Sequence, residues 1–196
     1  MNVLNLVLGI VGAYILGMLP SAIVIARAKG VDITSFGSGN PGASNVARAL
    51  GWKYGSLVFV LDAAKGAIPT LLLIGHRPSA YICGAMAIVG HIFPVTRSFK
   101  GGKGIATGGG VLLALHPVIM IIAAVSWVAI MMLSKKASIA SIAIVPLVVV
   151  LLIITDKPAW EVLAFVGLGL LIEIRHLSNI KRLLSGSEPP VTGSAH

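Results

Sequence analysis

The sequence predicts an all-α integral membrane protein with seven transmembrane helices and short amphipathic, interfacial elements in its cytoplasmic loops. Three observations support this fold class. Of the 196 residues, 57% are hydrophobic and only 11% are charged, whereas soluble domains average about 25% charged residues. The apolar residues gather in seven runs, and most lysines and arginines lie in alternate connections between those runs. We expect a single domain over residues 1–196.

The apolar runs define the expected helices. A bilayer core about 30 Å thick requires about 20 apolar residues per helix. The runs cover residues 3–26, 55–75, 80–93, 105–115, 118–133, 139–155 and 160–174. The third and fourth runs are short, and they could extend into the flanking loop, cross a thinned bilayer or form a re-entrant pair. The first run is long enough to span and lacks a basic leader, so no cleavable signal peptide is expected.

The basic residues set the expected orientation. Twelve of the 15 lysines and arginines lie in the connections after the first, third, fifth and seventh runs. Only Arg77 and Lys157 lie on the opposite side, and Lys65 lies within the second run. The positive-inside rule therefore places the N-terminus outside and the C-terminus in the cytoplasm. Lys65 shares a helix face with Asp62, three residues earlier, so the two can pair, either for function or for structure alone.

Composition also limits the classes of function. The formal charge of +9 is explained first by topology in a membrane protein, so no nucleic-acid partner is expected. The single cysteine, Cys83, cannot form a disulfide within the chain, and no metal-ligand pattern is evident. We therefore expect neither a metal nor a cofactor. The segment 185–196 is rich in Ser, Gly and Pro, and we expect a flexible tail there.

A first polar cluster lies in the connection after the first run. Residues 37–42 read Gly-Ser-Gly-Asn-Pro-Gly and match G-x-G-x-x-G. An expected transmembrane helix rather than a strand precedes them, so a dinucleotide fold is excluded. Ser38 and Asn40 offer hydrogen bonds, and the planar guanidinium of Arg48 suits phosphate. Residues 41–48 could begin an interfacial helix; the alternative is a solvated loop with a serine cap.

A second cluster is the basic, glycine-rich loop 99–104, Phe-Lys-Gly-Gly-Lys-Gly. Glycines allow backbone N–H groups to turn inward as an anion-binding nest, and the two lysines add positive charge. The alternative is an ordinary cytoplasmic turn. The loop lacks Walker A spacing, which argues against ATP hydrolysis. His91, before the loop, could equally cap the end of its helix.

A third cluster closes the last run. On a helix, His176 and Asn179 lie on one face, with Arg175 and Arg182 on a neighbouring one. Histidine can accept a proton near neutral pH, and asparagine can orient it or a substrate hydroxyl. A basic helix end that reaches toward lipid headgroups would explain the arginines but not His176 and Asn179. Ser141 belongs to the same expected side of the membrane.

The three clusters together suit the binding of two anionic groups and the activation of a hydroxyl. A transporter or channel for an organic phosphate would use a similar cluster of basic residues at its entrance. Transporters commonly place polar residues near the bilayer midplane within repeated halves. Here the polar residues gather at one expected face, which favours an enzyme.

In order and spacing, these motifs resemble those of the bacterial acyl-phosphate:glycerol-3-phosphate acyltransferases, small polytopic membrane enzymes of phospholipid synthesis. The sequence departs from the family pattern at Thr34, where arginine is common, at Ser44, where threonine is usual, and at Ser178, where glutamate is frequent. The resemblance implies acyl transfer from acyl phosphate to sn-glycerol 3-phosphate, giving lysophosphatidic acid and phosphate. It implies no acyl-CoA, metal or obligate protein partner. It also implies a bacterial cytoplasmic (inner) membrane location, contact with membrane lipids and an active site at the cytoplasmic face.

The resemblance also suggests roles for individual residues. The expected catalytic residues are Ser38, Arg48, Lys103, His176 and Asn179. The expected substrate-binding residues are Gly39, Asn40, Gly42, Asn45, Lys100, Gly101, Gly102, Gly104, Thr107 and Ser141. The base that deprotonates the attacking hydroxyl is either His176 or a phosphate oxygen of the donor, and the sequence leaves both open.

Overall fold

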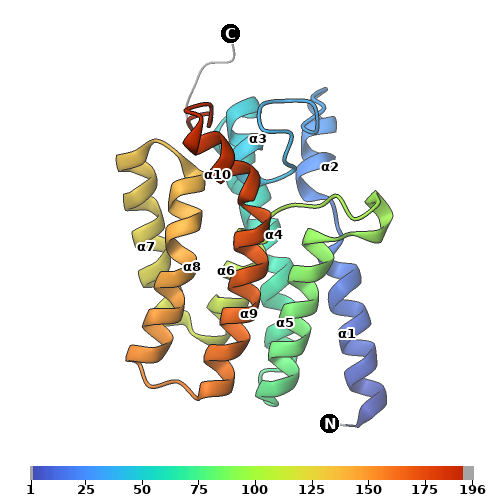
Figure 1. Ribbon diagram of the computed structural model, residues 1–196. Helices are drawn as coiled ribbons and strands as arrows, with labels where there is room; N and C mark the ends of the chain where they lie inside the picture. Colours follow the sequence, from blue (N-terminus) through green and yellow to red (C-terminus); the bar gives the residue numbers. More distant parts are fainter. Residues whose placement is uncertain (1, 192–196) are drawn as a thin grey trace. The chain divides into compact units, whose positions relative to one another are not determined.

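The computed structural model describes residues 2–191 and contains only helices and loops over that range (Figure 1). The predicted all-α fold class is confirmed for those residues. The chain divides into two compact units, which we treat separately. Residues 2–115 form the N-terminal unit, and residues 116–191 form the C-terminal unit.

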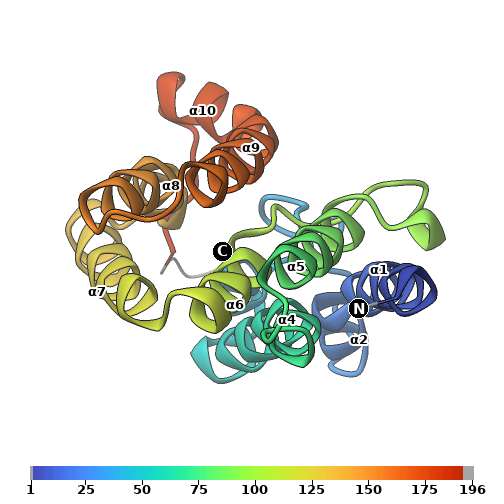
Figure 2. The same ribbon diagram turned by 90° about the horizontal axis from the view of Figure 1, so that it is seen from below.

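The N-terminal unit is built on long apolar helices with two short helices at one end. Its elements are α1 (Val3–Gly17), α2 (Ser21–Arg27), α3 (Ala43–Leu50), α4 (Trp52–Leu72), α5 (Arg77–Ile92), the 3-10 helix η1 (Val95–Arg97) and α6 (Ile105–Leu115). Helix α4 packs against α6 and α5, and α5 packs against α1 (Figure 2). The polar loops thus connect helices whose apolar faces form one core.

The first apolar run is interrupted. Residues 18–20 separate α1 from α2, because Pro20 has no N–H to continue the helical ladder. The ammonium of Lys65 on α4 donates to the carbonyl of Leu19 in this break and also to the Asp62 carboxylate. Asp62 and Lys65 are 2% and 4% exposed, so the predicted ion pair exists and is buried.

Glycines allow α4 and α6 to approach closely. A Cβ added at Gly66 would lie 2.1 Å from the Thr107 carbonyl oxygen. One added at Gly110 would lie 1.9 Å from the Ala63 carbonyl oxygen. Any larger residue at either position would therefore collide with the opposite backbone. This explains Gly110, the last glycine of the α6 triplet, as a helix-packing position.

The C-terminal unit is a row of helices in chain order. It contains α7 (Pro117–Ser134), α8 (Ala137–Ile154), α9 (Ala159–Arg175) and α10 (Leu177–Leu184). Helices α7 and α8 lie side by side, α9 follows α8, and α10 continues from α9 after a 51° bend (Figure 2). At the other end of α9, His116 Nε2 and Glu161 Oε2 form a buried pair 3.1 Å apart.

Fewer helices than expected meet the length and hydropathy of a membrane span. Among the described residues, five stretches do so: Val3–Arg27, Trp52–Leu72, Arg77–Arg97, Pro117–Ser134 and Ala137–Ile154. The bent pair α9–α10 would make a sixth. The fourth predicted span, α6, has only 11 residues, or about 16 Å of helix. The count of seven and the orientation of the termini therefore stay predictions.

Both short polar helices are amphipathic, as the sequence predicted for the loop elements. Helix α3 begins at Ala43, two residues later than expected, with Gly42 as its N-cap in an extended conformation. Helix α10 presents its basic residues, Lys181 and Arg182, in its last turn. Positive charge at that end interacts favourably with the helix dipole.

Candidate active site

Asn45 organises the first polar loop. It is 2% exposed, and its Nδ2 donates to the carbonyls of Ile33 at 3.1 Å and Phe36 at 2.9 Å. Its Oδ1 accepts the N–H of Ser38 at 3.2 Å. The side chain thus uses both donors and its acceptor to fold the loop onto α3. Asn45 thereby positions Ser38, and the expected substrate contact of Asn45 stays a prediction.

The rest of the loop is a series of tight turns. Gly37 and Gly39 have φ values of 56° and 66°, a region that residues with a Cβ seldom adopt. The Gly39 N–H donates to the Phe36 carbonyl, and the Gly42 N–H donates to the Asn40 carbonyl. Ser38 and Asn40 remain half-buried at the surface of the loop. Their side chains are therefore placed where a ligand could reach them.

The glycine-rich loop is not an open nest. The Gly101 N–H donates to the Ile92 carbonyl at 3.1 Å and the Gly102 N–H to the His91 carbonyl at 3.0 Å. The Lys100 N–H donates to the Arg97 carbonyl at 3.0 Å. These three amides are used to hold the loop against the end of α5. An anion cradle made of the glycine amides stays a prediction, and in this structure the amides of Gly101 and Gly102 are engaged within the chain.

Glycine is required here for space. A Cβ on Gly101 would lie 2.1 Å from the His91 carbonyl oxygen, and one on Gly102 would lie 2.1 Å from His91 Nε2. The loop can therefore pass over His91 only as Gly-Gly. Whether the two glycines also contact substrate stays a prediction.

The next backbone donors lie at the start of α6. Gly104, at φ 89°, accepts the N–H of Gly108 at 2.7 Å and so begins the helix. The first N–H groups of an α-helix have no intrahelical partner and carry partial positive charge. Lys103 stands directly before this turn and is half-buried. An anion beside Lys103 would meet these amides rather than those of the glycine pair.

Thr107 lies inside the helix packing of the N-terminal unit. It is fully buried in α6, and its Oγ1 has no hydrogen-bond partner among residues 2–191. Its carbonyl packs against Gly66 on α4. Thr107 thus lies at the contact between α6 and α4, and its expected substrate contact stays a prediction.

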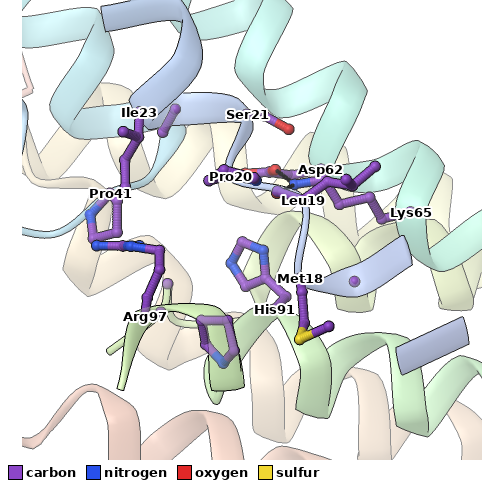
Figure 3. Close-up of a pocket in the computed structure, with 15 residues that line it drawn as sticks. Met18, Leu19, Pro20, Ser21, Ile23, Pro41, Asp62, Lys65, His91 and Arg97 are labelled. Carbon is purple, nitrogen blue, oxygen red and sulfur yellow. Dashed lines mark hydrogen bonds and ion pairs between the residues drawn. The ribbon is translucent and has the colours of Figure 1, made fainter. Parts of the chain in front are cut away.

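A small, partly open cavity lies beside the glycine-rich loop (Figure 3). His91 and Arg97 project into it, and Pro41 and the break at residues 18–20 form other parts of its wall. Gly101, Gly102 and the Asp62–Lys65 pair complete its polar lining. Sequence reasoning placed only the two glycines in the site. In the sequence, Arg97 is a charge that follows an apolar run. The sequence argument used this charge only to predict the orientation of the helices.

His176 is held at the bend between α9 and α10. The residue is 2% exposed, and its Nδ1 lies 2.9 Å from the Ile172 carbonyl oxygen. A carbonyl can only accept, so Nδ1 donates this hydrogen bond and carries a proton. The backbone thus helps to orient the ring, and the expected role of Asn179 in fixing the geometry stays a prediction.

Asn179 and Arg182 share a carboxylate that sequence reasoning missed. Asn179 Nδ2 donates to Glu188 Oε1 at 2.7 Å, and Arg182 Nε donates to Glu188 Oε2 at 2.7 Å. Glu188 is 4% exposed. Burial alone would raise its pKa, but hydrogen bonding with Ser138, Asn179 and Arg182, together with the charge of Arg182, holds the pKa of Glu188 below its usual range. Glu188 is the only acid after Glu173, which is the signal that could have found it.

Part of the expected tail is therefore ordered by contacts. Glu188 is bound as described, and the Val191 N–H donates to the Lys135 carbonyl at 2.9 Å. The flexibility expected from residue 185 stays a prediction, although residues 185–191 make these contacts. Residues 192–196 lie outside the described residues.

Ser141 joins two helices of the C-terminal unit. Its Oγ accepts the indole N–H of Trp127 at 3.1 Å, and the residue is 7% exposed. The structure thus gives Ser141 a contact between α7 and α8, and a substrate contact through its hydroxyl hydrogen stays a prediction. Among residues 2–191, no three His, Cys, Asp or Glu side chains gather as possible metal ligands.

The expected catalytic residues divide between the two units. Ser38, Arg48 and Lys103 belong to the N-terminal unit, with the cavity and the start of α6. His176 and Asn179 belong to the C-terminal unit. Cationic groups and helix amides dominate the first set, and a proton acceptor with a bound carboxylate dominates the second. The fold and these polar sites define a helical membrane protein suited to anionic substrates.

Comparison with known proteins identifies the family within this class. The sequence profile described as Glycerol-3-phosphate acyltransferase matches residues 7–186. The chain belongs to this acyltransferase family. It is 40% identical over 183 residues to a glycerol-3-phosphate acyltransferase of Aquifex aeolicus, covering 91% of this chain and 95% of that protein. It is 36% identical over 187 residues to the Bacillus subtilis protein of the same name, covering 93% and 95%.

Solved structures agree over nearly the whole chain. The fold is similar to a crystal structure of PlsY (YgiH), an integral membrane glycerol 3-phosphate acyltransferase, in its glycerol 3-phosphate form. The TM-score is 0.91 with 38% identity, and the match covers 96% of each chain. The lysophosphatidic acid form of PlsY matches with a TM-score of 0.88 over 95% of each chain.

Proposed function

We propose that this acyltransferase moves the acyl group of an acyl phosphate to the 1-hydroxyl of sn-glycerol 3-phosphate. The products are lysophosphatidic acid and inorganic phosphate, in an early step of bacterial phospholipid synthesis. One observation carries the proposal. Over 95% or more of both chains, the protein is similar to PlsY, an acyltransferase with one crystal structure in a glycerol 3-phosphate form and one in a lysophosphatidic acid form.

Cationic side chains of the N-terminal unit supply the charge that two phosphates require. Arg48 offers a planar fork for phosphate oxygens, and Lys103 adds a point charge before the first turn of α6. Ser38, positioned by Asn45, provides a hydroxyl in the same unit. Preorganised donors of this kind stabilise the negative oxygen that develops on the acyl carbonyl.

The reaction needs one proton acceptor. The 1-hydroxyl oxygen attacks the acyl carbonyl carbon, and the bond from that carbon to the phosphate oxygen breaks as phosphate leaves. The hydroxyl proton passes to His176 Nε2, since Nδ1 of the same ring donates to Ile172. Donor phosphate oxygen is the alternative acceptor. Because phosphate is a good leaving group, positioning and electrostatic stabilisation suffice without a covalent intermediate.

The same proposal places the protein in the bacterial cytoplasmic (inner) membrane, with seven spans, the N-terminus outside and the site at the cytoplasmic face. Twelve of the 15 lysines and arginines in alternate connections support this orientation. In a Cys83→Ser background, Lys136→Cys should react with a membrane-impermeant maleimide only from the cytoplasmic side. Asp156→Cys should react only from the outside. Reaction of both from one side would contradict the topology.

The activity test uses purified full-length protein, acyl phosphate and labelled glycerol 3-phosphate, with lysophosphatidic acid as the readout. We expect product with acyl phosphate and none with acyl-CoA. Lys103→Gln should lower kcat/KM by about 100-fold or more. The matched control Lys157→Gln, which removes a lysine from an opposite connection, should stay within about twofold of wild type. Uptake of glycerol 3-phosphate into sealed vesicles without acylation would favour a transporter and contradict the proposal.

A further inference from the structure

Arg97 is a cation that the proposed reaction does not use. It ends the 3-10 helix η1, is half-buried, and projects into the cavity of the N-terminal unit (Figure 3). Its guanidinium has no hydrogen-bond or ion-pair partner among residues 2–191. A partly desolvated guanidinium without an anion is unfavourable. The arrangement is therefore suited to an anion from outside the chain.

A second arginine increases the positive potential at this position. Arg27, the last residue of α2, is close enough to Arg97 for their charges to interact. The acid nearest to Arg27 in the sequence, Asp32, accepts the backbone N–H of Thr34 at 2.9 Å and its hydroxyl at 2.6 Å. These hydrogen bonds lower the pKa of Asp32, which keeps it ionised. Asp32 offsets part of the charge of Arg27 but forms no ion pair with Arg97.

Both arginines lie at the ends of candidate membrane spans. The stretch Val3–Arg27 ends at the first, and the stretch Arg77–Arg97 ends at the second. The helices α1 and α5 of these two stretches pack against each other. Basic side chains at span ends lie at the depth of lipid headgroups and are attracted to anionic ones.

Apolar side chains stand on both sides of Arg97 in the sequence and face outward. Val95 is 55% exposed and Phe99 is 57% exposed. Phe99 also has a φ of 62°, a conformation that a bulky residue adopts only when its surroundings impose it. The loop thus holds an aromatic ring away from the protein even though the backbone of Phe99 is strained. An aromatic ring beside basic residues is typical of the membrane interface.

We propose that Arg97 and Arg27 bind the phosphate headgroup of an anionic membrane lipid at the edge of this cavity, with Val95 and Phe99 in the adjoining interfacial layer of the bilayer. The guanidinium of Arg97 provides the charge-assisted hydrogen bonds, and Arg27 adds the field that favours an anion. The apolar pair explains why the occupant is a lipid rather than free phosphate. The site is additional to the acyl-transfer machinery and does not require either substrate.

The test is native mass spectrometry of the full-length protein in a neutral detergent, titrated with phosphatidylglycerol or phosphatidylcholine and without acyl-transfer substrates. We expect one tightly bound phosphatidylglycerol and weaker phosphatidylcholine. Arg97→Gln should weaken the phosphatidylglycerol complex by about tenfold. Arg97→Lys should recover part of the loss. The control Lys53→Gln removes an exposed charge outside the cavity lining and should change affinity by less than about twofold.

Two further arms separate a lipid from free phosphate. Phe99→Gly tolerates the positive φ but removes the ring, so it should weaken lipid binding with the melting temperature unchanged. Millimolar inorganic phosphate should leave the lipid bound. Equal lipid binding by Arg97→Gln and wild type would overturn the proposal. So would displacement by inorganic phosphate together with unchanged binding by Phe99→Gly. Because no turnover is measured, either outcome is independent of the proposed acyl transfer.

Discussion

The glycine-rich loop after α5 and the segment from His176 to Glu188 both bring polar groups to the ends of apolar helices. The loop is held by backbone groups, and the segment is held by side chains. In the loop, backbone amides of Gly101 and Gly102 donate to backbone carbonyls, and the absence of side chains makes this possible. In the segment, a buried carboxylate from Glu188 binds two side chains. Glycine therefore indicates close packing in the first region, and charge pairing orders the second.

The difference separates the groups that build each region from those that we propose to meet a ligand. In the N-terminal unit, the loop amides build the structure, and the proposed ligand groups are the cationic side chains and the start of α6. In the C-terminal unit, the Ile172 carbonyl fixes the His176 ring, and Nε2 is the proposed proton acceptor. The following substitutions test this division, from the largest expected effect to the smallest.

Glu188→Ala should have the largest effect on stability. It leaves Arg182 and Asn179 without their shared carboxylate, and breaking a buried charge pair costs about 3–5 kcal/mol. We expect a lower melting temperature in detergent and loss of acyl transfer together. The variant Ser187→Ala, a neighbour that is exposed, serves as control. A melting temperature equal to wild type would mean that the carboxylate does not order this segment.

Gly102→Ala should damage the fold of the loop rather than substrate affinity alone. The added methyl group would collide with His91 Nε2, and overpacking of this kind costs about 1–3 kcal/mol. The control is Gly12→Ala, where an added Cβ meets nothing within 4 Å. A higher KM for glycerol 3-phosphate with unchanged melting temperature and kcat would instead support the open anion nest.

Asn45→Ala should destabilise the first loop by about 1–3 kcal/mol, because the Ile33 and Phe36 carbonyls and the Ser38 N–H lose their partner. Thermal unfolding measures this loss. Asn45→Asp keeps the acceptor for Ser38 but not the two donors, so it should fall between Asn45→Ala and wild type. If Asn45→Ala raised KM without lowering the melting temperature, a substrate contact would be the better explanation.

The pH dependence of stability should show the smallest effect. The pKa of Glu188 is below its usual range in the folded protein. Its contribution is therefore complete above the pKa of the unfolded chain and is lost as pH falls through the folded pKa. Acidification through that range should lower the melting temperature of wild type more than that of Glu188→Gln. Parallel curves for the two proteins would contradict the ionised, paired carboxylate.

Patterns of hydrophobicity and charge predicted the helical membrane class and the ion pair of Asp62 and Lys65, because both depend on spacing along one helix. They also predicted a short amphipathic helix near residue 43. The use of each backbone amide could not be predicted, since the partners of Gly101 and Gly102 depend on the path of the loop. The buried state of Glu188 could not be predicted either, because a carboxylate among Ser, Gly and Pro has no periodic signal. The membrane depth of α6 depends on packing that composition does not encode.

The pH–rate profile of His176→Gln is the most direct test of the account, which assigns proton transfer to the C-terminal unit and phosphate binding to the N-terminal unit. Lysophosphatidic acid formation is measured with saturating acyl phosphate. We predict that kcat falls by about 100-fold or more, that KM for glycerol 3-phosphate and the melting temperature change little, and that the acidic limb of the profile disappears. Near wild-type turnover with an unchanged pH dependence would contradict the account and assign the base to the donor phosphate.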